Sequence, residues 1–374
     1  MTPARHRLAS LDAFRGLAIA GMILVNNPGS WNAVFPPLVH ADWNGCTFAD
    51  LVFPSFIFIL GAAMPFAFSR RLASGHETAA MYRRIVRRSA SLVGLGLVLN
   101  AAAAYPAVNA LRIPGVLQRI GLVYLATAFI LLHAGAGRRA AIAIALVAGH
   151  WALLALVPFG GHAAGTLTPE VNLAGFVDRL LFGPHTLNRF GDPEGLLGTL
   201  PAVATALAGT LAGQWMRDAD GPRRRLVGLV AGGAIGAAAG LAWSVVLPLN
   251  KALWTGSYAL FTAGLASLVF AACYWLIDVQ AVDAWARPFV WLGVNPLALY
   301  FLSELTSDLL DRPWLRVAGE TMAVKTWLFW ELIDPLVGGR LQEMGVSLVF
   351  ALLTLAAWIA VAGVLHRRGV RIHV

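Results

Sequence analysis

The sequence predicts an all-α membrane protein, a polytopic bundle of about ten transmembrane helices. Of its 374 residues, 58% are hydrophobic and 13% are charged, whereas a soluble domain is roughly 25% charged. Apolar runs of about 20 residues recur along the whole chain, and each is long enough to cross the hydrocarbon core as a helix. These runs are too long for the strands of a membrane barrel, and they lack the alternation of apolar and polar residues that such strands show. We therefore predict a single transmembrane domain over residues 1–374, embedded in a lipid bilayer.

Ten apolar runs are predicted to be the spans, and the first is predicted to be retained. It follows a basic start, as a signal peptide does, but it ends in NNPGSW rather than in a small-residue cleavage site. The spans are expected at about 10–27, 50–69, 84–104, 115–134, 138–158, 196–216, 225–247, 256–277, 287–306 and 346–366.

The segment 323–338 is apolar but short, and Glu331, Asp334 and Pro335 interrupt it. It is predicted to be an interfacial or re-entrant helix. An eleventh span is the alternative, but that span would move the basic C-terminal segment to the outer side of the membrane.

Arginine clusters in alternate connectors predict the orientation. Cytoplasmic connectors of membrane proteins carry an excess of Lys and Arg. The clusters fit an even number of spans with both termini in the cytoplasm, and they account for the net charge of +9 without a nucleic-acid partner. The cluster residues are Arg5, Arg7, Arg70, Arg71, Arg83, Arg84, Arg87, Arg88, Arg138, Arg139, Arg217, Arg223, Arg224, Arg225, Arg287, Arg367, Arg368 and Arg371.

The sequence predicts no metal site and no disulfide framework. The chain has two cysteines, Cys46 in the first connector and Cys273 inside a later span. Their spacing matches neither a metal-ligand motif nor a small disulfide-rich domain.

The connector HADWNGCTFAD, residues 40–50, has no Lys or Arg and is therefore predicted to face away from the cytoplasm. His40 can accept and return a proton near neutral pH, and Asp50 can fix its tautomer. TFAD also matches a capping box, with Thr47 as N-cap and Asp50 three residues later. Both roles are compatible, because a cap would hold the carboxylate at the helix mouth where it could orient His40.

Other polar residues gather toward the outer ends of the spans. Asn26 ends the first span, where its amide could terminate the helix or donate to a developing oxyanion. Arg119, preceded by Gln118, enters the fourth span. An arginine there is a functional hypothesis by default, either gripping an anion or pairing with a carboxylate such as Glu194 or Glu304.

Three further outer motifs carry polar side chains. In DPEG, Asp192 is predicted to be a helix N-cap with Pro193 at the first helical position. Asn250 and Lys251 begin NKALWTGSY, where interfacial snorkelling is the simpler role for the lysine. Asn295 begins NPLALYFLSEL, whose polar stripe continues through Ser303 and Glu304 and should face the bundle interior.

Several motifs together resemble the heparan-α-glucosaminide N-acetyltransferase family. They are SLDAFRGLAIAGMILVNNPGSW, HADWNGCTFADLVFPSFIFILGAA, GVLQRIGLVYL, DPEGLLGTLPA, NKALWTGSYALFTAG and NPLALYFLSEL, in the expected order over nearly the whole chain. The chain looks like the compact bacterial form, which lacks the N-terminal lumenal region and first anchor of the animal lysosomal enzyme. This implies a bacterial inner membrane location.

The resemblance implies an acyltransferase that moves acetyl from cytosolic acetyl-CoA across the membrane to the amine of a glucosamine on the far side. It implies catalytic roles for His40, Asn26 and Asp50. Asp42 stands where the human-type motif has a small residue, so the acceptor preference is not carried over. We further assign acceptor binding to Trp43, Asn44, Asn250, Lys251, Asp192 and Glu194, and acetyl-CoA binding to Gln118, Arg119 and Asn295. A homodimer is a further expectation.

Two chemical routes and two other functions stay open at this point. His40 could act as the base for direct attack by the amine, which we prefer, or it could carry the acetyl group itself. An O-acyltransferase of surface polysaccharide would keep the same chemistry with an alcohol acceptor. A sugar transporter would show two halves with matched interrupted helices, but NPLALYF has no counterpart in the first half.

Overall fold

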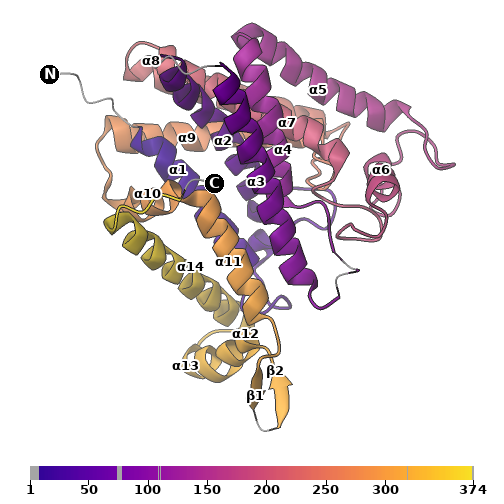
Figure 1. Ribbon diagram of the computed structural model, residues 1–374, viewed down its shortest axis with the longest axis vertical. Helices are drawn as coiled ribbons and strands as arrows, with labels where there is room; N and C mark the ends of the chain where they lie inside the picture. The colour runs from indigo at the N-terminus through magenta and orange to yellow at the C-terminus, as the bar shows by residue number, and fades with distance from the viewer. Residues whose placement is uncertain (1–7, 74–77, 108, 110, 318, 373–374) are drawn as a thin grey trace. The chain divides into compact units, whose positions relative to one another are not determined.

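The computed structural model describes residues 8–73, 78–107, 109, 111–317 and 319–372, and its regular structure is almost entirely helical (Figure 1). Within these residues nine helices are long and apolar enough to cross a membrane, and a bent helix pair raises the number to ten if it counts as one span. The expected number is therefore matched only if the bent pair is one span. The sides on which the termini lie remain predictions, and Arg5 and Arg7 fall outside the described residues.

Contacts within the chain divide the described residues into two compact units. The first contains residues 8–11, 42–46 and 54–283, and the second contains residues 12–41, 47–53 and 284–372. The predicted catalytic connector 40–50 therefore contributes residues to both units.

The first unit is built from long helices and the short helix α6. They are α2 (Phe48–Ala73, from Pro54 onward), α3 (Thr78–Ala104), α4 (Val116–His133), α5 (Ala136–Leu156), α6 (Leu173–Phe182), α7 (Leu196–Asp218), α8 (Pro222–Ser244) and α9 (Gly256–Cys273), which the π-helix Tyr274–Val279 continues.

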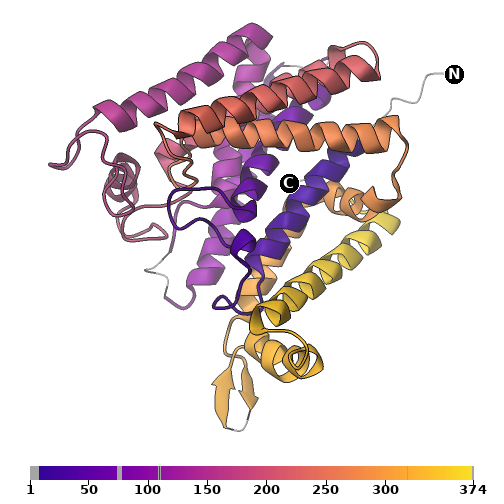
Figure 2. The same cartoon turned by 180° about the vertical axis from the view of Figure 1, so that it is seen from behind.

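Glycines allow these helices to approach one another closely. The pair α8 and α9 lies side by side in both views (Figures 1 and 2). A Cβ at Gly240 would clash with the backbone of Phe261, and one at Gly264 would clash with the backbone of Ala237. Such small-residue contacts stabilise helix pairs in lipid, where the hydrophobic effect does not drive association.

The second unit begins with α1 (Ala9–Asn26, from Asp12 onward) and the first residues of α2. It continues with the 3-10 helices Pro36–Leu38 and Ala284–Ala286, α10 (Arg287–Val294), α11 (Pro296–Leu310), β1 (Leu315–Val317), β2 (Glu320–Met322), α12 (Val324–Trp327), the π-helix Leu328–Ile333, α13 (Asp334–Val337) and α14 (Glu343–Arg367). Close packing joins α1 to α10, because a Cβ at Gly16 or Gly293 would clash with the facing backbone.

The predicted span 287–306 is not one continuous helix. It is two helices, Ala284–Val294 and Pro296–Leu310, bent by 79°. Asn295 at the break has φ −125° and ψ 49°, outside the helical region. Pro296 has no backbone N–H and cannot continue the hydrogen-bonded ladder from the preceding turn. The Asn-Pro pair therefore starts a new helix instead of extending the old one.

Two further details depart from an uninterrupted all-α bundle. Strands β1 and β2 form an antiparallel hairpin whose turn includes Gly319, at a φ of 92° that favours glycine. The predicted interfacial segment is helical from Val324 to Val337 but is not among the candidate spans. It is shorter than the roughly 20 residues that a span requires.

Candidate functional site

His40 and Asp50 form a hydrogen-bonded pair in the second unit. The His40 Nδ1 atom lies 2.8 Å from Oδ1 of Asp50. The His40 side chain is 48% exposed, whereas that of Asp50 is 1% exposed. With Nδ1 donating to the carboxylate, the tautomer leaves a lone pair on Nε2, which can accept a proton. The pair therefore has the arrangement of an accessible base oriented by a buried acid.

Asp50 is fixed by the first turn of α2 and by the backbone that precedes it. Its Oδ2 accepts hydrogen bonds from the backbone N–H groups of Ala41 and Thr47, each at 3.0 Å. The bond to Thr47, which directly precedes the helix, is one half of the predicted capping box. The Thr47 hydroxyl donates to the carbonyl of Val39 at 2.7 Å. The cap thus holds the carboxylate that contacts His40.

Asn26 ends α1 and donates from Nδ2 to Oε1 of Glu304 at 2.9 Å. The end of α1 packs beside the start of α2, because a Cβ at Gly21 would lie 3.1 Å from the side chain of Val52. Counting 1.5 Å per residue from this contact, Asn26 and Asp50 lie within about 10 Å of each other along the helix axes. The second unit therefore brings all three predicted catalytic residues into one region.

Residues 42–46 belong to the first unit, where they contact two connectors that are predicted to lie on the outer side. Trp43 donates from its indole to the carbonyl of Leu167 at 2.8 Å. Asn250 donates from Nδ2 to Oδ1 of Asn44 at 3.2 Å, and it is buried. The structure thus joins two of the predicted acceptor-binding residues, and Lys251 follows Asn250 in a half-buried position.

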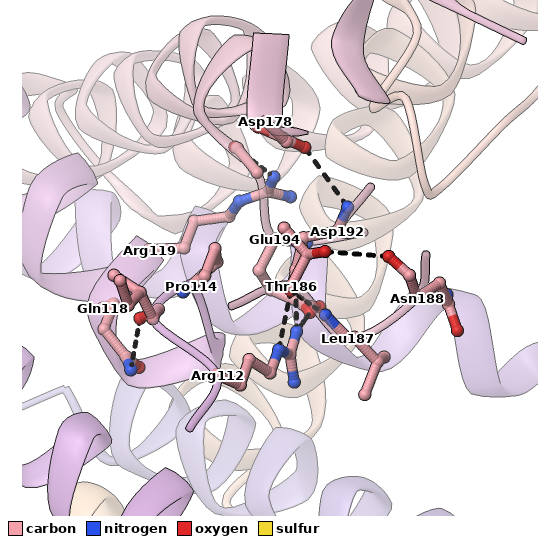
Figure 3. A network of polar contacts seen from close by, with 12 residues as sticks. Arg112, Pro114, Gln118, Arg119, Asp178, Thr186, Leu187, Asn188, Asp192 and Glu194 are labelled. Atoms are coloured by element: carbon pink, nitrogen blue, oxygen red, sulfur yellow. Dashed lines mark hydrogen bonds and ion pairs between the residues drawn. The ribbon is translucent and has the colours of Figure 1, made fainter. Parts of the chain in front are cut away.

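A second polar network lies in the first unit around Arg112 (Figure 3). The guanidinium contacts both oxygens of Asp192, at 2.8 Å from Nε and 2.6 Å from Nη2, and it also pairs with Glu194. Burial alone would raise the pKa of Asp192, but the hydrogen bonds and charge of Arg112 hold it below its usual range. The two carboxylates assigned to the acceptor are therefore already engaged by an arginine.

The predicted N-cap role of Asp192 is wrong, because Asp178 of α6 caps the next helix instead. Helix α7 begins at Leu196, and the buried Asp178 accepts the N–H groups of Leu196 at 3.0 Å and Asp192 at 3.2 Å. Burial raises the pKa of Asp178 above its usual range. The DPEG turn is thus positioned by Arg112 on one side and Asp178 on the other.

Gly195 is the residue that allows Asp178 to approach the start of α7. It has φ −66°, which alanine adopts readily, but a Cβ there would clash with the Asp178 carboxylate. We expect Gly195→Ala to destabilise the protein by roughly 1–3 kcal/mol, because it overpacks the site and displaces the cap. The measurement is the free energy of unfolding in detergent, with Gly137→Ala as the matched control because its Cβ would meet open space. Equal stabilities for the two variants would contradict this account.

Comparison with known proteins identifies the family. Residues 7–229 match the model of the catalytic region of heparan-alpha-glucosaminide N-acetyltransferase. This chain belongs to that family. It is 29% identical to the human heparan-alpha-glucosaminide N-acetyltransferase over 364 residues, which cover 82% of this chain and 54% of the human one. The mouse protein of the same name is 28% identical, with 83% and 55% covered. The chain thus spans about half the length of the curated relatives it matches.

The members of this family are N-acetyltransferases, so the chain belongs to a family of transferases. The matched region contains His40, Asp50 and Asn26 together with the Arg112 network. It ends before α9 and before the whole of α10 to α14. The alignments with the human and mouse proteins extend over most of the chain, so the likeness is not confined to the matched region.

The three residues predicted to bind acetyl-CoA have partners inside the protein. Gln118 donates to the carbonyl of Ile113 at 3.0 Å. Arg119 is 1% exposed, donates to the carbonyl of Gly195 at 2.9 Å and stacks 5.1 Å from the ring centre of Trp254. Asn295 bonds the backbone of Val370 and Ile372 near the C-terminus. These contacts support the fold, and acetyl-CoA binding by these residues remains a prediction.

Sequence analysis did not assign three residues that the structure places in these sites. Arg112 and Asp178 lie in connecting or short helical segments, and pairing between distant segments is not visible in sequence. Glu304 was predicted to belong to a polar stripe or to pair with Arg119, and it was not assigned to the catalytic region, although a carboxylate within a span is itself a signal. Among the described residues, no group of three His, Cys, Asp or Glu side chains could hold a metal ion.

Proposed function

We propose that the protein is a transmembrane N-acetyltransferase that uses cytosolic acetyl-CoA to acetylate the amine of a glucosamine-type sugar on the periplasmic side. Its location would be the inner membrane of a bacterium, with both termini in the cytoplasm. The observation that carries the proposal is the His40–Asp50 pair, a half-exposed imidazole held by a buried carboxylate. Family membership supports the type of reaction, and the polytopic helices support the membrane location.

In the proposed reaction, the amine nitrogen attacks the carbonyl carbon of the thioester. A C–N bond forms, the C–S bond breaks, and the products are the N-acetylated sugar and coenzyme A. His40 accepts the proton that the nitrogen loses and can return it to the leaving thiolate, so protons balance. Asp50 stabilises the imidazolium. An N–H of Asn26 is the proposed donor to the oxyanion of the intermediate.

The cationic clusters are proposed to attract the donor. Coenzyme A carries phosphates, which arginine binds strongly. The sequence concentrates arginine in the connectors assigned to the cytoplasm, for example Arg83, Arg84 and Arg87 at the start of α3, and all three are exposed. The pantetheine arm is thin enough to enter a helical bundle, which would bring the thioester toward the outer end. Assembly as a homodimer remains a separate prediction.

The proposal is tested with purified protein in detergent. Acetyl-CoA is supplied with glucosamine, and thiol release and N-acetylglucosamine are both quantified. We expect the two products in equal amounts, and no thiol release when glucose replaces glucosamine. Acetylation of glucose or a polysaccharide hydroxyl instead would favour an O-acyltransferase. Sugar uptake into proteoliposomes with no thiol release from any acceptor would favour a transporter.

A further inference from the structure

Glu304 is a carboxylate in the candidate catalytic region that has no role in the reaction described above. It lies on α11, in the apolar helix pair that could form a span, and it is partly exposed. Its contact is the 2.9 Å hydrogen bond from the amide of Asn26. Because that amide is the proposed oxyanion donor, the carboxylate lies beside the place where the acceptor and thioester would meet.

Among the acids of the second unit, Asp12 and Asp311 have cationic partners, whereas Glu304 has none in the described part of the chain. Asp12 pairs with Arg15 at 3.2 Å, and Asp311 pairs with Lys325 at 3.4 Å. Within the described part of the chain, no Lys, Arg or His forms an ion pair with Glu304. An ionised carboxylate among membrane helices is costly unless an opposite charge or hydrogen bonds compensate it. One amide hydrogen bond leaves most of its acceptor capacity unused.

A positively charged ligand group would supply the missing partner. An amino sugar in water at neutral pH carries its nitrogen mainly as an ammonium ion with three N–H donors, whereas a sugar hydroxyl carries no charge. A carboxylate therefore distinguishes the two acceptor classes, and specificity is strongest when the wrong ligand leaves a buried polar group unpaired.

We propose that Glu304 binds the ammonium group of the acceptor sugar and makes the site selective for amines over alcohols. The inference rests on the proposed function and specifies its acceptor. Glu304 holds the ammonium beside Asn26. The ammonium first gives one proton to water, which frees the nitrogen lone pair for attack on the thioester, and the second proton leaves the nitrogen during the attack. The selectivity thus comes from binding, whereas the proton transfer during attack belongs to His40.

The test must separate this role from simple positioning of Asn26. Glu304→Gln is suited to that purpose, because the Gln carbonyl still accepts the Asn26 hydrogen bond while the negative charge is gone. We expect the KM for glucosamine to rise at least about tenfold, since hydrogen bonds to charged groups contribute more than neutral ones. The KM for acetyl-CoA should stay unchanged. The matched control is Glu170→Gln, which removes an exposed carboxylate in an outer connector.

Equilibrium binding without donor gives a readout that does not depend on catalysis. Wild-type protein is expected to bind glucosamine more tightly than glucose, and Glu304→Gln is expected to lose that preference. If no acetyl transfer occurs but the preference is present and lost in the variant, the proposed function fails while the ammonium site stands. An unchanged KM and an unchanged preference in the variant would overturn the ammonium site.

A measurement on wild-type protein covers the case in which Glu304→Gln does not fold. A carbodiimide joins a carboxylate to a bound amine as an amide, with loss of one water. After treatment with glucosamine, mass spectrometry should find the sugar attached at Glu304. Attachment at exposed carboxylates such as Glu170 with none at Glu304 would contradict the proposal.

Discussion

Replacing His40 with alanine is expected to reduce the rate of glucosamine acetylation by roughly 10²–10⁴-fold, the range that a positioned general base contributes. The structure gives the reason. Nδ1 is committed to Asp50 at 2.8 Å, so Nε2 is the nitrogen that can accept the proton of the attacking amine. The measurement is the initial rate of N-acetylglucosamine formation with both substrates saturating. A rate within threefold of wild type would exclude His40 as the base.

A loss of activity in His40→Ala has to be distinguished from a loss of folding. Removal of His40 leaves Oδ1 of the buried Asp50 without this partner, while Oδ2 keeps the N–H groups of Ala41 and Thr47. The free energy of unfolding should therefore fall by about 1–3 kcal/mol, which leaves the variant folded for the assay. Added imidazole should restore part of the activity of His40→Ala, because it can occupy the vacated volume as a soluble base. Asp50→Asn is a second control: it retains an oxygen that can cap α2 but removes the charge that stabilises imidazolium. It is expected to lower the rate while leaving the unfolding midpoint close to that of wild type.

Direct attack by the amine and transfer through an acetylated His40 differ in how much thiol acetyl-CoA releases when no sugar is present. Direct attack predicts that acetyl-CoA alone releases no stoichiometric thiol. An acetyl-imidazole route predicts one thiol and one attached acetyl group per active site before any sugar is added. Rapid mixing of the protein with labelled acetyl-CoA, followed by mass spectrometry of the fragment that contains His40, distinguishes these outcomes. We expect no acetylated fragment.

Local patterns in the sequence predicted much of the helical architecture and part of the candidate site. Each long apolar run had to satisfy its backbone within itself, so helices followed from hydropathy alone. The link between His40 and Asp50 was also readable, because a capping box fixes the acid and the residues lie ten positions apart. The region matched by the family model then added the type of reaction.

What could not be predicted depended on contacts between distant segments. The Asn-Pro pair is a local signal for the bend, but the hydrogen bonds that hold Asn295, to the carbonyl of Val370 and from the N–H of Ile372, come from a distant segment. The DPEG turn read locally as a helix cap, yet a carboxylate 14 residues earlier took that role, because Arg112 had engaged Asp192. A rule based on local sequence fails where a residue distant in sequence forms hydrogen bonds or ion pairs with the same atoms.

Because of these ion pairs, loss of Arg112 should lower the stability of the protein strongly. Its guanidinium compensates Asp192 and Glu194, whose side chains are 0% and 8% exposed. Removing one partner of a buried pair leaves an uncompensated charge and typically costs about 3–5 kcal/mol. We expect Arg112→Met to destabilise the protein by about that amount. The exposed Arg316→Met serves as the matched control and should stay near wild type.

The pH dependence of the free energy of unfolding of Arg112→Met shows whether the lost charge causes the destabilisation. In the wild type, the lowered pKa of Asp192 means that its contribution is present above the unfolded value of 3.8 and is lost only as pH falls below it. Without Arg112, burial dominates and raises that pKa, so the folded state binds protons more readily than the unfolded state. The variant's deficit relative to wild type should therefore be larger at pH 8 than at pH 5. Unfolding in detergent at pH 5 and pH 8 measures this deficit.

Adding Asp192→Asn and Glu194→Gln to Arg112→Met should recover most of the lost stability, because neutral amides need no cation. A deficit that is independent of pH and persists in the triple variant would instead indicate that packing of the arginine side chain, rather than its charge, stabilises this turn.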